Sequence, residues 1–200
     1  MTSEFINIKY SKGLFFVIMR IIGGARRGTK LYTLEGLNTR PSLDRVKEAL
    51  FNIINFDLED AIVLDLFSGS GALALESLSR GAKKAYLCDN NYKAIEIIKK
   101  NVEKTKFEDK TVIINKSYEK VLDYFKINNI LFDIVFFDPP YESDYAIKSV
   151  EYIIKNDLLN DDGFIVIETD NDNVINNLNN VDIYDIRKYG RVKLLFLKKK

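Results

Sequence analysis

The chain of 200 residues contains no histidine, no tryptophan, three prolines and one cysteine. Without histidine, His-based acid–base catalysis, Ser-His-Asp triads and the usual zinc sites are excluded. One cysteine cannot form a disulfide within the chain. Cys88 ends the apolar run Ala85–Leu87, which predicts a small, buried core residue. We therefore expect a reducing, cytoplasmic setting.

Long hydrophobic runs are missing as well. Leu14–Ile18 is apolar but too short to span a membrane, and no small-residue cleavage site follows it. We therefore expect no membrane contact. Met19 begins a stretch that is typical of a natural protein start, so residues 1–18 are predicted to be an extension outside the fold.

The formal net charge is only +1, but the charges are unevenly placed. Residues 1–50 carry a net charge of +5, residues 51–186 carry −11, and residues 187–200 carry +7. Basic ends favour contact with a phosphate backbone. Residues 19–38 are predicted to form a basic β-hairpin arm, in which two apolar runs flank a turn rich in glycine and arginine. A solvated hairpin has the same pattern; the candidate phosphate contacts are Arg20, Arg26, Arg27 and Lys30.

The stretch Asp65–Gly71 (Asp-Leu-Phe-Ser-Gly-Ser-Gly) follows a short apolar run and precedes an apolar-periodic run from Ala72 to Leu78. This order is typical of a strand, a glycine turn and a helix. Glycines permit a sharp turn and a close approach of the backbone to a ligand, and the start of a helix offers unpaired N–H groups. We therefore predict a cofactor site at the carboxyl end of this strand.

Two cofactors fit this pattern, and a glycine turn without a ligand fits it too. Gly69-x-Gly71-x-x-Ala74, with Asp89 20 residues after Gly69, matches the relaxed dinucleotide fingerprint. Asp65 favours S-adenosyl-L-methionine, because its carboxylate suits the ammonium group that this cofactor carries and NAD lacks. A carboxylate at Asp89 can accept hydrogen bonds from both ribose hydroxyls of an adenosine. No metal is implied.

The tetrapeptide Asp138-Pro139-Pro140-Tyr141 follows the apolar run Ile134–Phe137. Two prolines cannot continue a ladder of backbone hydrogen bonds, so the strand ends there in a stiff turn. Asp138 and the Pro139 carbonyl are two acceptors that can hold an amino group, and Tyr141 can stack on a base. The tetrapeptide resembles motif IV of methyltransferases that act on exocyclic amino groups of bases, although a plain proline turn has the same pattern.

Strand and helix patterns alternate after the glycine turn, which predicts an α/β fold with a mostly parallel sheet covered on both faces. A helix after Pro41, with Ser42 as its N-cap, precedes this alternation. The predicted strands are residues 61–66, 84–89, 111–115, 132–137 and 163–168, and the predicted helices are residues 72–80, 92–105, 118–126, 143–156 and 173–179. Two more strands, 183–189 and 192–197, flank Gly190 as a hairpin, so at least one C-terminal strand is expected to be antiparallel.

From Met19 to its C-terminus the chain resembles the bacterial ribosomal RNA small-subunit methyltransferase D family. Four stretches carry the resemblance: Met19–Gly24 with its hairpin, Thr39–Phe51, Leu64–Glu76 with Ser79–Ala82, and Asp138–Tyr141. It implies a Rossmann-like class I methyltransferase fold over residues 39–200, with a seven-stranded sheet and the arm as an N-terminal appendage. It also implies methyl transfer from S-adenosyl-L-methionine to N2 of a guanine in 16S ribosomal RNA. The implied partner is the small ribosomal subunit or an assembly intermediate, contacted by a monomer through the basic arm.

The resemblance also implies roles for single residues. Asp65, Phe67, Gly69 and Gly71 line the methionine end of the cofactor, and Asp89 binds its ribose. The full cofactor-binding set comprises Thr39, Arg40, Pro41, Asp65, Phe67, Ser68, Gly69, Gly71, Asp89, Asn90, Ser117 and Asp138. The guanine is held by Asp138, Pro139, Pro140 and Tyr141. Where family members carry an acid near the adenine amino group, this chain has Ser117, whose hydroxyl is a weaker acceptor.

Three other functions fit parts of the sequence. The Asp-Pro-Pro-Tyr tetrapeptide also serves methylation of N6 of adenine in DNA or RNA, which is the closest alternative. A non-catalytic RNA-binding protein on a methyltransferase scaffold does not need the intact motif at Asp138. An NAD-dependent oxidoreductase lacks a proton-relay histidine here and leaves the tetrapeptide unexplained.

Overall fold

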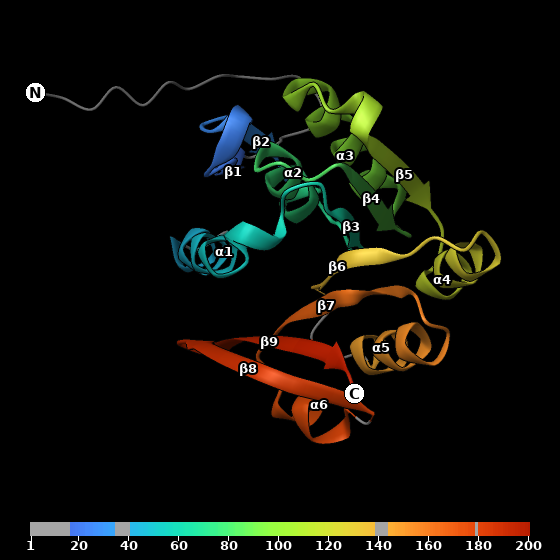
Figure 1. The fold of residues 1–200 in the computed structure, drawn as a ribbon. Coiled ribbons are helices and arrows are strands. Elements are labelled where there is room, and N and C mark those ends of the chain that lie inside the picture. Colours follow the sequence, from blue (N-terminus) through green and yellow to red (C-terminus); the bar gives the residue numbers. More distant parts are fainter. Residues whose placement is uncertain (1–16, 35–40, 139–143, 179) are drawn as a thin grey trace, which may run out of the picture.

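Strands and helices alternate along the chain, and seven strands join into one sheet in the order β5-β4-β3-β6-β7-β9-β8 (Figure 1). The computed structural model describes residues 17–34, 41–138, 144–178 and 180–200. The strands of the sheet are β3 (Ile62–Asp65), β4 (Lys84–Asp89), β5 (Thr111–Asn115), β6 (Phe132–Phe137), β7 (Leu159–Thr169), β8 (Val181–Tyr189) and β9 (Val192–Lys199). The helices are α1 (Pro41–Ile53), α2 (Ala72–Ser79), α3 (Tyr92–Thr105), α4 (Tyr118–Ile127), α5 (Tyr145–Lys155) and α6 (Asp172–Asn177), with short 3-10 turns at Gly24–Arg26, Asn55–Asp57 and Glu108–Lys110.

Strands β3 to β7 run parallel, as the alternation of strands and helices predicts. Strand β9 lies antiparallel to both β7 and β8, which confirms the predicted hairpin around Gly190. The order of the strands reverses between β3 and β6, since the chain first builds outwards from β3 to β4 and β5 and then returns to pair β6 with β3. In open α/β sheets, such a reversal is where ligands bind, outside the carboxyl ends of the strands.

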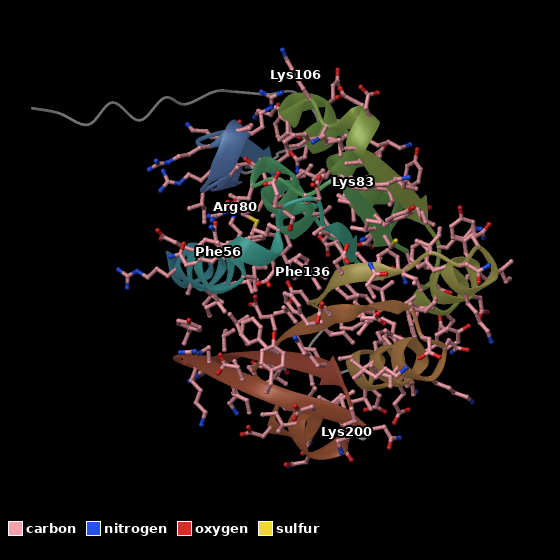
Figure 2. All side chains as sticks on the ribbon, viewed as in Figure 1. Phe56, Arg80, Lys83, Lys106, Phe136 and Lys200 are labelled. Atoms are coloured by element: carbon pink, nitrogen blue, oxygen red, sulfur yellow. The ribbon has the colours of Figure 1, made fainter. Side chains whose placement is uncertain are left out.

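Helices cover both faces of the sheet (Figure 1). Apolar side chains of α1, α2 and α3 pack on one face, and those of α4, α5 and α6 pack on the other. On the α1 face, the rings of Phe51 and Phe136 have centroids 5.9 Å apart, and Phe136 lies between the sheet and α1 (Figure 2). Cys88 is buried on the opposite face, as its apolar neighbours predict. Within the described residues, no helix has the length and apolar character that crossing a membrane requires.

Several predicted boundaries are wrong. Strand β8 begins at Val181 and β9 ends at Lys199, each two residues beyond the prediction, and α6 ends at Asn177, two residues early. Strand β7 begins at Leu159, four residues before the predicted start, because its exposed residues Asp161 and Asp162 interrupt the apolar pattern.

Helix α1 begins at Pro41, so Ser42 lies inside its first turn and is not the N-cap. Proline suits the first helical position, because the N–H that it lacks would have no partner within the helix. Helix α5 begins at Tyr145, two residues after the predicted start.

The predicted N-terminal hairpin is confirmed as a two-stranded antiparallel sheet of β1 (Val17–Arg20) and β2 (Lys30–Tyr32). Strand β1 starts two residues before Met19, so the predicted boundary between extension and arm lies inside a strand. Residues 1–16 and 35–38 lie outside the described residues, so the extension itself stays a prediction.

A buried carboxylate on α2 joins the arm to the main sheet. Glu76 is fully buried, and its two oxygens accept hydrogen bonds from the backbone N–H groups of Ile22 and Gly23, both at 2.8 Å. Two cations balance its charge: Lys47 of α1 at 3.5 Å and Arg80 at 2.9 Å. Figure 2 shows Arg80 beside the arm and α1. The arm is therefore held in a fixed position on the domain.

We expect Glu76→Ala to lower the free energy of unfolding by about 3–5 kcal/mol, because it leaves two buried cations and two backbone donors without their acceptor. Urea unfolding followed by circular dichroism measures this loss. Glu96→Ala, on the exposed side of α3, is the matched control and should change stability by less than about 0.5 kcal/mol. Equal stability of the two variants would contradict the role of Glu76.

Candidate functional site

The two sequence motifs meet at the reversal of strand order. Asp65 ends β3 and is paired in register with Phe136 of β6, and the Leu66 N–H donates to the Phe136 carbonyl at 3.3 Å. Asp138 follows β6 directly. The carboxyl ends of β3 and β6 therefore lie side by side, and the glycine loop after β3 starts next to Asp138. This juxtaposition is the one that the sequence predicts.

The glycine loop after β3 forms a tight turn into α2. Gly69 and Gly71 have φ angles of 54° and 78°, in the left-handed region that favours glycine. The Gly71 N–H donates to the Ser68 carbonyl at 2.7 Å, and a Cβ on Gly71 would lie 2.7 Å from Leu87 Cδ2. A Cβ on Gly69, in contrast, would meet no atom within 4 Å. The backbone at Gly69 is thus open to a ligand, whereas Gly71 is required for packing.

Asp65 is a buried carboxylate, 2% exposed, beneath this loop. The Ala74 N–H of α2 donates to its Oδ2 at 3.4 Å, and the Ser68 hydroxyl donates to the Asp65 backbone carbonyl at 3.1 Å. Burial raises the pKa of Asp65 to about 7; the Ser68 hydroxyl and the Ala74 N–H oppose this, and the negative charges of Asp138 and Asp89 add to it. Within the described residues no cation pairs with it. A positively charged ligand group at this position would favour its ionised form.

Asp89 ends β4 and is oriented by backbone donors. The Gly69 N–H donates to its Oδ2 at 2.9 Å, and the Asn91 N–H donates to its Oδ1 at 2.8 Å. Each oxygen keeps further acceptor capacity, so the carboxylate can still bind two hydroxyl groups. The neighbouring candidate Asn90 is exposed between β4 and α3.

Phe67 belongs to a group of aromatic rings beside the glycine loop. Its ring centroid lies 6.0 Å from that of Tyr118 and 6.2 Å from that of Tyr145, and the Phe67 and Tyr145 planes differ by only 8°. The two tyrosines were not among the predicted site residues, because they belong to different helices and no local pattern connects them. Ser117 is the N-cap of α4 but makes no side-chain capping bond; its hydroxyl bonds to Glu119.

Not all predicted site residues are described. Thr39, Arg40, Pro139, Pro140 and Tyr141 lie outside the described residues, and Pro41 is placed only as the first residue of α1. Asp138 is exposed. The surrounding protein excludes enough water to raise the pKa of its carboxyl, an effect that its solvent exposure moderates.

One further acid at this edge was not identified from the sequence. Glu168 lies near the end of β7 and close to Asp138: Phe137 pairs with Ile167, the two acids follow these residues directly, and the charge of Asp138 acts on Glu168. The signal in the sequence is slight: an acid directly after the apolar run Phe164–Ile167. Asp65 and Asp89 were predicted as cofactor-binding residues because they belong to the glycine-loop pattern. Glu168 belongs to no such motif.

The arm lies against the glycine loop. The Asn101 side chain of α3 donates to the Tyr32 carbonyl at 2.9 Å and to the Ser70 carbonyl at 2.8 Å. Of the four predicted phosphate contacts, Arg20, Arg27 and Lys30 are exposed. Arg26 is held within the protein, since its Nε donates to the Thr105 carbonyl at 2.7 Å and its guanidinium lies 5.6 Å from the centroid of the Phe107 ring.

The raised pKa of Asp65 predicts a pH-dependent stability. Between about pH 4 and 7 the folded state keeps a proton that the unfolded state releases, so the free energy of unfolding falls as pH rises through this range. Asp65→Asn removes this term, so we expect it to match the wild type near pH 4 and to be more stable by about 2–4 kcal/mol at pH 8. Urea unfolding at both pH values measures the difference, with Asp144→Asn, an exposed acid just before α5, as control. A difference that is the same at both pH values would contradict the raised pKa.

Residues 19–198 match a protein family described as conserved hypothetical protein 95. The chain is 37% identical to the ribosomal RNA small subunit methyltransferase D of Haemophilus influenzae over 157 residues, which cover 77% of this chain and 80% of that protein. It is 34% identical to the protein of the same name from Escherichia coli K12 over 155 residues, 78% of this chain and 76% of that protein.

The solved structure of a hypothetical protein from Thermus thermophilus has the same fold, with a TM-score of 0.76 at 26% identity, covering 90% of this chain and 98% of that chain. The strand order, the antiparallel β9 and the N-terminal two-stranded sheet agree with the predicted methyltransferase fold. Family match, relatives and fold lead to one conclusion: the chain belongs to the ribosomal RNA small subunit methyltransferase D family.

Proposed function

We propose that this protein transfers a methyl group from S-adenosyl-L-methionine to the exocyclic N2 amine of a guanine in 16S ribosomal RNA. The observation that carries the proposal is the pairing of β3 with β6. It places Asp65, a buried carboxylate suited to a cationic cofactor, next to Asp138, an acceptor suited to an amine. Relatives named ribosomal RNA small subunit methyltransferase D support the choice of substrate.

The residues present fit this cofactor. The Asp65 carboxylate has no cationic partner in the part of the chain that the structure describes and can pair with the ammonium group of the methionine moiety. The Asp89 carboxylate is aimed by two backbone N–H groups and can accept from the ribose hydroxyls. Gly69 leaves its backbone open for close approach. When bound, S-adenosyl-L-methionine supplies a methyl group on a positively charged sulfur, so no leaving-group acid is needed.

The chain itself contributes positioning and electrostatics. The guanine amine is a poor nucleophile because its lone pair is conjugated with the ring. Asp138 and the Pro139 carbonyl accept its two N–H groups and turn the lone pair towards the methyl donor, while Tyr141 stacks on the base; Pro139 and Tyr141 have these roles by their place in the motif. After transfer the nitrogen becomes strongly acidic, and Asp138 or water accepts its proton.

The distribution of charge indicates the side from which RNA approaches. The basic arm runs along α2 and α3. Tyr32 is joined to the glycine loop by Asn101. The turn at Arg26 contacts Ser79 and Thr105 at the far ends of the two helices. Its exposed cations therefore follow this flank of the domain, away from the glycine loop at the carboxyl edge of the sheet. At the opposite edge, a pocket at the amino ends of β3, β6 and β7 is lined by acids that repel phosphate: Asp57, Glu59, Asp60, Asp133 and Asp162. The target base must leave its stack to reach Asp138, so an exposed or looped nucleotide within the small subunit or an assembly intermediate is the substrate we propose, bound by a monomer.

The experiment that tests this function is methyl transfer from labelled S-adenosyl-L-methionine to small ribosomal subunits that lack the modification, beside naked 16S RNA and duplex DNA. Label recovered as N2-methylguanosine supports the proposal and identifies the assembly state. Label on adenine, or on DNA only, would refute the proposed substrate and leave the proposed cofactor standing. Cofactor binding without any transfer would favour a non-catalytic RNA-binding protein.

We expect Asp138→Ala to lower kcat/KM for subunit RNA by at least about hundredfold, because an acceptor for the amine is lost where charge develops. Binding of S-adenosylhomocysteine, measured by thermal shift, should remain close to that of the wild type. Asp144→Ala, an exposed acid at the start of α5, is the matched control. Turnover by Asp138→Ala near the wild-type rate would refute this role.

The arm predicts a change in the salt dependence of RNA binding. Replacement of Arg20, Arg27 and Lys30 together by alanine should weaken affinity and make the slope of log K against log salt concentration shallower by about two, since fewer counterions are released. Filter binding at several salt concentrations measures this slope. Lys120, Lys126 and Lys155, exposed on α4 and α5, form the control triple, whose replacement should leave the slope unchanged. An equal effect of both triples would argue against a specific role of the arm.

A further inference from the structure

Four neighbouring strands each carry a carboxylate at the carboxyl edge of the sheet. In sheet order these are Asp89 at the end of β4, Asp65 at the end of β3, Asp138 directly after β6, and Glu168 near the end of β7. The first three have roles in the proposed function: ribose, methionine ammonium and target amine. Glu168 is the next in the row, beyond the amine, and the proposed function leaves it without a role.

The register of β6 and β7 places Glu168 beside Asp138. Phe136 pairs with Val166 and Phe137 with Ile167, and the two acids directly follow the second pair. Side chains alternate between the faces of a sheet, and Phe136 and Val166 both belong to the α1 face. Asp138 and Glu168 therefore share that face with Asp65, whose carboxylate reaches α2.

Glu168 is half-buried and lacks a donor. Among the residues that the structure describes, none reaches its carboxylate with a hydrogen bond or an ion pair. Burial, and next the negative charge of Asp138, raise its pKa. This contrasts with Glu76, whose carboxylate has two backbone donors and two cations. Two neighbouring carboxylates, here Glu168 and Asp138, lower the stability of the fold when no hydrogen-bond donor lies between them. An N–H group of a ligand in that position would offset the loss.

We propose, on the basis of the function above, that Glu168 is the residue that selects guanine, by accepting the N1–H of the target base while Asp138 accepts its N2 amine. The order of the row supports this assignment. The cofactor occupies Asp89 and Asp65, the methyl group meets the amine at Asp138, and the ring that carries the amine extends towards β7. The group next to the N2 amine on the Watson–Crick edge of guanine is N1–H.

The chemistry of the base edge explains the selection. Guanine presents N1–H, a donor, to an acceptor-only carboxylate. Burial, and next the charge of Asp138, raise the pKa of Glu168 to about 8; the N1–H of guanine stabilises its ionised form, whereas the N1 lone pair of adenine cannot. A site built to bond a particular hydrogen-bonding group rejects a base that lacks it, because its own buried polar group is then unpaired.

A substrate analogue separates this role from a structural one. 2-Aminopurine keeps the 2-amino group of guanine but has an acceptor at N1 in place of the N1–H. The target guanine, once located by the labelling experiment, is replaced by 2-aminopurine through RNA ligation. Single-turnover methyl transfer is measured on both RNAs at a pH above 8, where the Glu168 carboxyl is ionised. The wild type should prefer guanine by roughly hundredfold, on the scale of a lost hydrogen bond to a charged group.

Glu168→Gln tests the residue directly, because its amide can donate to N1 of 2-aminopurine as well as accept from guanine. We expect it to reduce the preference for guanine at least about tenfold while S-adenosylhomocysteine binding, measured by thermal shift, is unchanged. Asp170→Asn, an exposed acid just after β7, is the matched control and should keep the wild-type preference. If Glu168→Gln does not fold, Glu168→Asp should retain the preference with a lower rate.

Two outcomes overturn the inference: a wild type that methylates guanine and 2-aminopurine equally well, or a folded Glu168→Gln with the wild-type preference. Both leave the proposed function intact, since guanine is still methylated. Failure of the wild type to methylate any guanine in RNA would instead refute the proposed function itself.

Discussion

The parallel pairing of β3 with β6 is the constraint on which the site depends. These strands are separated by the whole of β4, β5 and three helices in sequence, yet Asp65 and Phe136 are paired in register. Because the helices that follow the two strands pack on opposite faces, the carboxyl ends between them form a site for ligands. The glycine loop and Asp138 reach this edge from different motifs, and neither could act without the other.

Buried carboxylates have two opposite roles in this protein. Glu76 is satisfied by two N–H groups and two cations, and it fixes the arm to α2 and α1. Asp65 and Glu168 lack cationic partners across the described ranges of the chain, and burial raises the pKa of both. A buried charge with a partner contributes to the fold, whereas one without a partner lowers stability until a ligand supplies the partner. Stability given up at such positions is typical of a functional site.

The same distinction applies to the cations of the arm. Arg26 has the same charge as Arg27 and is its neighbour in the chain, but its guanidinium is bound to Thr105 and Phe107. Arg27 remains exposed. Since Glu76 and Asn101 hold the arm against the domain, its exposed cations keep a constant position relative to the glycine loop. A basic surface fixed along α2 and α3 can orient RNA on the domain without any movement of the arm.

Local chemistry alone was enough to predict much of this. Gly69, Gly71 and the acids at Asp65 and Asp89 indicated a strand, turn and helix with a cofactor site, because backbone freedom and side-chain charge act over a few residues. The prolines after Asp138 likewise ended β6, and Gly190 marked the C-terminal hairpin. The tertiary structure alone decided which strand ends are neighbours. The role of Glu168 depends on Asp138, 30 positions earlier, which the register of the sheet places beside it. The role of Glu76 depends on Ile22 and Gly23, more than 50 positions earlier, which the packing of the arm on α2 brings within hydrogen-bond distance. Such partners have no local pattern, because the energy of a buried charge depends on what the fold places around it.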